Sequence, residues 1–150
     1  MKIAILSGSV YGTAEEVARH AEGLLKAAGH EAWHNPRASL ADLQAFAPEA
    51  FLAVTSTTGM GELPDNLQPL YYAILDHLPA WSGLPGGVIA LGDSSYGDTF
   101  CGGGELVREL YAELGIRELQ SMLRLDSSES VTPETDAEPW LADFITALHS

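Results

Sequence analysis

The sequence predicts an α/β fold in which a doubly wound parallel sheet carries helices on both faces. Two observations support this prediction. Five apolar, strand-like runs alternate with amphipathic helical patterns along the 150 residues. Three of these runs lead into turns rich in glycine and hydroxyl groups, at the sheet edge where such folds bind ligands. We expect one domain spanning residues 1–150, because this length can bury a single core.

The first half of the chain supplies three of the expected strands and one long helix. The first strand is an uninterrupted apolar run, and the helix carries one apolar stripe that ends at Gly29, a typical C-terminal glycine. In order, the expected elements are a strand over Lys2–Ser7, a helix over Thr13–Ala28, a short edge strand over Glu31–Asn35, a connection over Pro36–Pro48 and a strand over Ala50–Thr55.

The second half continues the alternation. Its first strand is apolar throughout, which is typical of a strand buried on both faces, and Pro139 occupies the first turn of the last helix. The expected elements are a turn over Ser56–Asp65, a helix over Asn66–Leu78, a strand over Gly87–Gly92, a turn over Asp93–Cys101, a helix over Glu105–Leu114 that Gly115 closes, a strand over Arg117–Leu125, an acidic loop over Asp126–Glu138 and a final helix from Pro139.

The turn between the first strand and the first helix predicts an anion site. Orphan backbone N–H groups and the positive end of the helix dipole meet there, and Ser9, Tyr11 and Thr13 add hydroxyl groups. The turn contains neither Lys nor Arg, which favours a monophosphate held by neutral dipoles. The alternative is a capped helix start, because Thr13 and Glu16 match the capping-box spacing.

Composition limits the classes of partner. Seven Lys and Arg residues against 21 Asp and Glu residues give a net charge of −14, which argues against binding to nucleic acid or an anionic membrane. The same charge favours a basic protein partner, although solubility alone would also explain it. No apolar run reaches the length needed to span a bilayer. The strand pattern begins at Lys2, leaving no room for a signal peptide, and the single cysteine fits a cytoplasmic protein.

The turns after the third and fourth strands could hold a planar ligand. The first of them, Ser56–Asn66, combines hydroxyl groups with flexible glycines. The other, Leu91–Gly102, places the aromatic Tyr96 among small residues, where it could stack on a flat ring while Asp93 meets a polar edge. A half-buried surface aromatic is the alternative interpretation of Tyr96.

With these turns in place, the chain resembles the short-chain flavodoxins, which carry electrons on FMN, and the MioC-type members in particular. The segment Ser9–Ala14 resembles the family's phosphate loop, and Gly92–Tyr96 followed by Phe100–Gly102 resembles its isoalloxazine loop. Leu123–Asp126 resembles the end of its last strand. The resemblance covers essentially the whole chain and implies a flavodoxin-like sheet of five parallel strands in the order 2-1-3-4-5.

The resemblance implies FMN as the cofactor and assigns its parts to the three turns. Residues 9–14 would hold the phosphate, residues 57–60 would lie along the inner face and N5 edge of the flavin, and Tyr96 would stack on the outer face. Asp93 and Cys101 would surround the pyrimidine end. The implied cofactor-binding residues are Ser7, Ser9, Val10, Tyr11, Gly12, Thr13, Ala14, Thr57, Thr58, Gly59, Met60, Gly61, Gly92, Asp93, Tyr96, Phe100 and Cys101. We expect no catalytic residue and no metal site.

The resemblance also implies the partners. A basic NAD(P)H-dependent flavodoxin reductase would supply electrons, an acceptor redox enzyme would receive them, and the carrier would be a cytoplasmic monomer. The alternative is an FMN-dependent reductase of quinones or other small molecules that uses NAD(P)H. Thr58 stands where the family often has an aromatic residue, and its small side chain could leave room for a second planar substrate. Tyr11 likewise replaces the usual Thr of the phosphate loop.

Two other classes fit the sequence poorly. A response-regulator receiver would resemble families with acidic residues after the first and third strands, where this chain has Ser7-Gly8 and Thr55-Ser56. A serine hydrolase would need a G-x-S-x-G elbow, which the sequence lacks. It would also need a histidine near the three turns, and we expect all five to lie away from them: His20, His30, His34, His77 and His149.

Overall fold

One parallel sheet runs through the computed structural model, which describes residues 1–58, 61–92, 101–126 and 132–149. The strand order is β2-β1-β3-β4-β5, and β6 also pairs with β4, so β5 and β6 together fill the fifth position. The predicted order 2-1-3-4-5 is therefore confirmed. The strands are β1 (Lys2–Gly8), β2 (Glu31–His34), β3 (Ala50–Thr55), β4 (Pro85–Gly92), β5 (Arg117–Glu118) and β6 (Leu123–Asp126).

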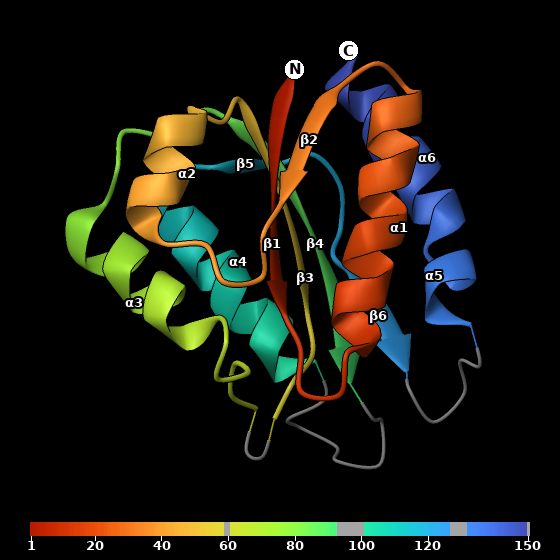
Figure 1. Ribbon diagram of the computed structural model, residues 1–150, viewed down its shortest axis with the longest axis horizontal. Helices are drawn as coiled ribbons and strands as arrows, with labels where there is room; N and C mark the ends of the chain where they lie inside the picture. Colours follow the sequence, from red (N-terminus) through yellow and green to blue (C-terminus); the bar gives the residue numbers. More distant parts are fainter. Residues whose placement is uncertain (59–60, 93–100, 127–131, 150) are drawn as a thin grey trace.

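Helices cover both faces of the sheet, as the alternating pattern predicts. The helices α1, α5 and α6 lie on one face, and α2, α3 and α4 lie on the other (Figure 1). Their bounds are α1 (Thr13–Ala27), α2 (Leu40–Phe46), α3 (Gln68–His77), α4 (Gly102–Leu114), α5 (Pro133–Asp136) and α6 (Glu138–Leu148). Gly29 and Gly115 follow α1 and α4 with positive φ, as predicted for glycines at helix ends.

Each face of the sheet has its own apolar core because side chains alternate along a strand. On β1, Ile3 and Ile5 pack with α1 and α6, while Ala4 and Leu6 belong to the core under α2, α3 and α4. The core residues of β1 and β3 are almost completely buried. This two-sided burial explains the continuous apolar runs in the sequence.

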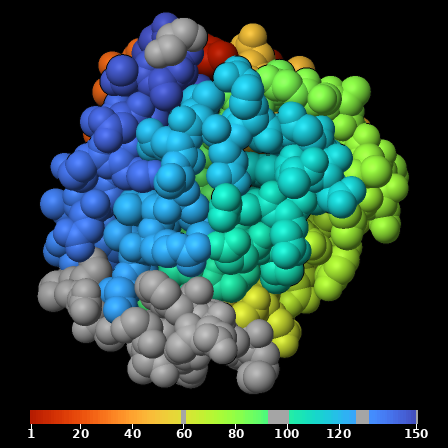
Figure 2. Space-filling view, turned by 180° about the vertical axis from the view of Figure 1, so that it is seen from behind, coloured from red at the N-terminus to blue at the C-terminus, as the bar shows by residue number. Residues whose placement is uncertain are grey.

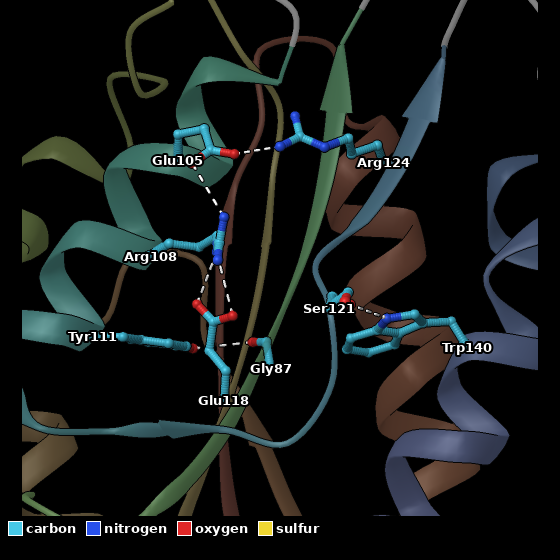
Figure 3. Close-up of polar contacts among 8 residues, drawn as sticks. All are labelled: Gly87, Glu105, Arg108, Tyr111, Glu118, Ser121, Arg124 and Trp140. Carbon is cyan, nitrogen blue, oxygen red and sulfur yellow. Dashed lines mark hydrogen bonds and ion pairs between the residues drawn. The ribbon is translucent and has the colours of Figure 1, made fainter.

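The fifth strand is interrupted, which the prediction of one continuous strand over Arg117–Leu125 missed. Between β5 and β6, the Gln120 side chain donates to the Trp140 carbonyl at 2.9 Å, and the Trp140 indole donates to the Ser121 carbonyl at 2.8 Å. The ring of Trp140 also fills the space beside Gly87, where a β-carbon would lie 2.8 Å from it. The interruption therefore lies where α6 inserts an aromatic ring, as Figure 3 shows for Ser121 and Trp140.

Three further expectations need correction. The connection over Pro36–Pro48 contains helix α2, which Ser39 and Asp42 begin with a reciprocal capping box. The acidic loop expected over Asp126–Glu138 contains the short helix α5. Helix α4 begins at Gly102, three residues before its expected start, despite the low helix propensity of glycine.

The strands that lead into the three turns singled out in the sequence all end at the same edge of the sheet. The strands β1, β3 and β4 are parallel, and their carboxyl ends at Gly8, Thr55 and Gly92 all point to this edge. The strand order reverses between β1 and β3, which is where open α/β sheets bind ligands. Among the described residues, none of the helices is long and apolar enough to cross a membrane.

Candidate functional site

A pocket of about 210 Å³ lies beside the turn after β1. Its walls come from three parts of the chain that meet at the sheet edge: the turn with the ends of β1 and α1 that flank it, the segment after β2, and Asn66 before α3. The lining residues are Ser7, Ser9, Val10, Gly12, Glu15, Pro36, Arg37 and Asn66. The donor set of hydroxyl, amide and guanidinium groups suits a phosphate monoester, whereas the Glu15 carboxylate opposes an anion.

The start of α1 gives this pocket its backbone donors. Gly12 is the N-cap with φ of +90°, and the first intrahelical bond runs from the Glu16 amide to the Gly12 carbonyl at 3.0 Å. The amides of the first helical turn therefore lack acceptors within the helix. Because the N-cap is a glycine, the capping box of Thr13 and Glu16, the alternative interpretation of this turn, does not form. The helix begins as an open anion site, with the positive end of its dipole toward the pocket.

The phosphate-loop residues divide into buried and exposed groups. Ala14 is fully buried under the loop, while Val10 and Tyr11 are 51% and 95% exposed. The Tyr11 side chain thus projects into solvent. Ser7 is buried at the end of β1, and its Oγ lies 2.7 Å from Nε2 of His34. The expectation that all histidines lie away from the turns is therefore wrong for His34.

A cation also borders the pocket, although the turn itself has none. Arg37 enters from the segment after β2, where Asn35 accepts a hydrogen bond from the Arg37 amide at 3.0 Å. The pocket therefore contains a positive charge, whereas the sequence of the turn alone predicts a site made only of neutral dipoles. His34 adds a titratable group, and burial is the main cause that lowers its pKa, while Glu22 and Glu15 raise it and Arg19 lowers it further.

The turn after β3 is closed by its own backbone. Thr58 and Glu62 form an isolated antiparallel bridge, with the Thr58 amide donating to Glu62 and the Glu62 amide donating back, both at 2.8 Å. Gly61 has φ of +90°, and its amide donates to the Thr58 carbonyl at 3.0 Å. Gly59 and Met60 lie outside the described residues.

The first turn of α4 packs directly on this second turn. The Gly103 amide donates to the Thr57 hydroxyl at 3.0 Å. A β-carbon on Gly102 would lie 2.8 Å from the backbone of Gly61, and one on Gly103 would lie 2.5 Å from the Ser56 carbonyl oxygen. These distances are too short for any side chain, so the glycines that lower helix propensity here permit the close approach. The structure thereby brings Thr57, Thr58 and Gly61 next to the start of α4.

Cys101 is buried at the start of α4, at the end of the third predicted turn. It is the N-cap of α4 with φ of +59°, its side chain is fully buried, and its Sγ lies 3.6 Å from the Ala90 carbonyl. Burial raises the pKa of the thiol to about 11, although Arg124 nearby lowers it. The thiol is therefore neutral at physiological pH. Gly92 lies beside it at the end of β4, paired with Asp126, whereas Asp93, Tyr96 and Phe100 lie outside the described residues.

A chain of ion pairs joins the start of α4 to the fifth strand position. Glu105 pairs with both Arg124 of β6 and Arg108, and Arg108 also pairs with Glu118 of β5 at 2.9 Å (Figure 3). The two arginines and Glu118 line a pocket of about 420 Å³ together with residues 120–122, on the face that Figure 2 shows. Arg124 brings a positive charge near Cys101 that the sequences of the three turns do not contain.

Sequence reasoning missed that Arg37 and Asn66 line the first pocket and that His34 contacts the Ser7 hydroxyl beside it. The strand order could have predicted part of this, because a strand that lies next to β1 and parallel to it must end at the same edge of the sheet. His34 closes β2 and Arg37 follows it, so both positions can be placed beside the first turn once β2 is assigned next to β1.

Comparison with known proteins places these features in a family. The family model described as flavodoxin matches residues 5–140. Flavodoxin YqcA of Escherichia coli K12 is 42% identical over 147 residues, with 98% of each chain covered. The protein MioC of the same strain is 37% identical over 151 residues, with 97% of each covered.

The solved structures that are similar to this chain also include flavodoxins. The C101A mutant of flavodoxin from Pseudomonas aeruginosa has 80% sequence identity and a TM-score of 0.97, with both chains covered completely. A Fusobacterium nucleatum flavodoxin solved with bound flavin mononucleotide is 18% identical, with a TM-score of 0.74 and coverage of 99% of this chain and 96% of that one. The second match shows a shared fold.

Proposed function

Because this chain belongs to the flavodoxin family, whose members are electron carriers with FMN as their cofactor, we propose that it takes single electrons from a basic NAD(P)H-dependent reductase and delivers them to an acceptor redox enzyme. When bound, the isoalloxazine ring of FMN can accept and release electrons one at a time. The protein would then bind the ring with one edge accessible to partners, and would retain it between the encounter with the reductase and the encounter with the acceptor.

The observation that carries the proposal is the pocket at the switch point of the sheet. Its hydroxyl and amide donors, Arg37 and the amino end of α1 together suit a phosphate monoester. We propose that residues 9–14 hold the FMN phosphate there. The ring would lie toward Thr57, Thr58 and Gly61 on one side and toward Cys101 on the other, and the expected contacts from Gly59, Met60, Asp93, Tyr96 and Phe100 remain part of the same proposal.

Charge supports the choice of a basic reductase. The chain carries a net charge of −14, and the exposed residues Glu62 and Asp65 lie in the second half of the turn after β3. A positively charged partner would be steered toward such a rim, and the effect would weaken as salt screens the charges. A cytoplasmic location belongs to the same proposal, since reductase and acceptor must meet the carrier in one compartment.

Titration of the apoprotein with FMN and riboflavin tests the function. One FMN should bind per chain and riboflavin should bind far more weakly, because it lacks the group that the first pocket receives. Equal affinity for the two flavins would contradict the phosphate site. The loaded protein should pass electrons from a reductase to a one-electron acceptor at a rate that falls as ionic strength rises. Rapid turnover of a quinone with NAD(P)H alone would instead favour the alternative, a small-molecule reductase.

A further inference from the structure

We infer that Asn66 is a positioning residue for the cofactor phosphate, which fixes the shape of the first turn from outside that turn. The residue lies two positions before α3, far in sequence from the turn after β1. The inference rests on the proposed FMN site and adds to it a residue that neither the phosphate-loop motif nor the sequence pattern singles out.

The Asn66 side chain binds three separate segments at once. Its Oδ1 accepts a hydrogen bond from the Ser9 amide at 2.9 Å. Its Nδ2 donates to the Ser7 carbonyl at 3.0 Å and to the Pro36 carbonyl at 3.1 Å. One primary amide therefore connects the end of β1, the first turn and the segment that carries Arg37.

The chemistry of the three contacts selects asparagine. A primary amide offers one acceptor oxygen and two N–H donors, and these groups face one backbone N–H and two backbone carbonyls. Aspartate at this position would direct a carboxylate oxygen at two carbonyls and add a negative charge to the wall of an anion pocket. Alanine would remove all three bonds without adding bulk.

These bonds determine how the phosphate loop presents its donors. Asn66 fixes the backbone of Ser9, and the Ser9 hydroxyl in turn accepts a hydrogen bond from the Gly12 amide at 2.7 Å. Ser9 thereby spans the turn between the last residue of β1 and the N-cap of α1. A turn that is already in shape loses less conformational freedom when the phosphate binds, and this increases affinity. Riboflavin, which has no phosphate, would gain nothing from the same arrangement.

The test compares Asn66→Ala with Gln68→Ala in the full-length protein. Gln68 is a matched control: it is also an amide at the start of α3, and its Nε2 donates to the Leu63 carbonyl at 2.7 Å, away from the pocket. Asn66→Ala should weaken FMN binding about tenfold, because the phosphate would then have to order a turn that is no longer held in shape. Riboflavin affinity should change by less than about twofold, and Gln68→Ala should leave both affinities unchanged. Asn66→Asp should weaken FMN binding at least as much as Asn66→Ala.

Other results would overturn the inference. An equal loss of FMN and riboflavin affinity in Asn66→Ala would mean that the residue only stabilises the fold, and no loss would mean that the turn needs no support. Hydrogen exchange of the Ser9 and Gly12 amides in the apoprotein gives an independent readout. Faster exchange in Asn66→Ala than in wild type and Gln68→Ala supports the inference, and equal exchange contradicts it. If the wild type binds no FMN, the proposed function fails, while the exchange measurement still decides the role of Asn66.

Discussion

The two described ends of the candidate site are built in different ways. At the first pocket, side chains hold the turn: Asn66 and Ser9 bind backbone amides, and a β-carbon on Gly12 would meet nothing within 4 Å. At the second turn, backbone lies directly on backbone, and Gly102 and Gly103 leave no space for even a methyl group. The phosphate end should therefore be sensitive to the loss of polar groups, and the ring end to the addition of atoms.

Gly103→Ala should have the largest effect, because the new β-carbon would lie 2.5 Å from the Ser56 carbonyl oxygen, and a backbone atom cannot rotate away. We expect a loss of about 3 kcal/mol in the free energy of unfolding, at the upper end for overpacking. Gly12→Ala should cost only about 1 kcal/mol, through its positive φ alone. Urea unfolding measures both.

Gly23→Ala provides the control for this pair, because Gly23 is exposed in α1 with open space around it. It should stabilise the protein by up to about 1 kcal/mol through helix propensity. If Gly12→Ala destabilised the protein as much as Gly103→Ala, the contrast between the two ends would be wrong.

The buried thiol gives the second prediction. Because burial raises the pKa of Cys101 from 9.0 to about 11, the thiolate fraction near pH 8 should be about 100-fold below that of the unfolded chain. Alkylation by iodoacetamide should accordingly be at least that much slower in the folded protein and should accelerate toward pH 11. The same reaction in urea is the reference, and similar rates in both conditions would contradict the burial.

The raised pKa of Cys101 also determines whether the free energy of unfolding rises or falls with pH. Between pH 9 and about 11 the unfolded thiol releases its proton while the folded thiol retains it, so the free energy of unfolding should fall as pH rises through this window. Below pH 9 the thiol is protonated in both states and contributes no slope. Cys101→Ser should remove this part of the pH dependence.

Arg37→Gln should have a moderate effect that is confined to the phosphate end. Loss of the cation beside the pocket should weaken FMN binding about fivefold at low salt, a cost of about 1 kcal/mol, and the difference should shrink as salt rises. Arg117→Gln is the control, because it makes the same charge change at the start of β5, the opposite end of the sheet. Equal effects of the two variants would indicate a response to net charge alone.

Glu105→Gln should have the smallest effect. Its pairs with Arg124 and Arg108 are partly exposed, so the loss in stability should stay below about 1 kcal/mol. The variant should also lower the pKa of Cys101, since the Glu105 charge raises it and the Arg124 charge that lowers it would remain. The pH profile of alkylation would show this shift toward lower pH, and a shift toward higher pH would contradict the arrangement in Figure 3.

Local patterns were enough to predict β1, the turn after it and the start of α1. The apolar run, the glycines and the helical stripe that define these elements follow one another directly in the sequence. The start of helix α2 was also predictable, since Ser39 and Asp42 have the spacing of a capping box. The interruption of the fifth strand could not be predicted from the local sequence, because the segment between β5 and β6 contacts Trp140, which comes from a distant helix. The role of Asn66 likewise depends on contacts between segments that only the folded chain brings together.

The interrupted fifth strand has a consequence for how the protein behaves when it is concentrated. A long, regular outer strand is a template onto which a strand of another molecule can add, and sheet proteins need protection from such association. Here the outer position offers two residues in β5 and four in β6, and the intervening backbone bonds to Trp140. The opposite outer strand, β2, is four residues long. Both outer strands of the sheet are thus short, so neither offers a long template for the strand of another molecule.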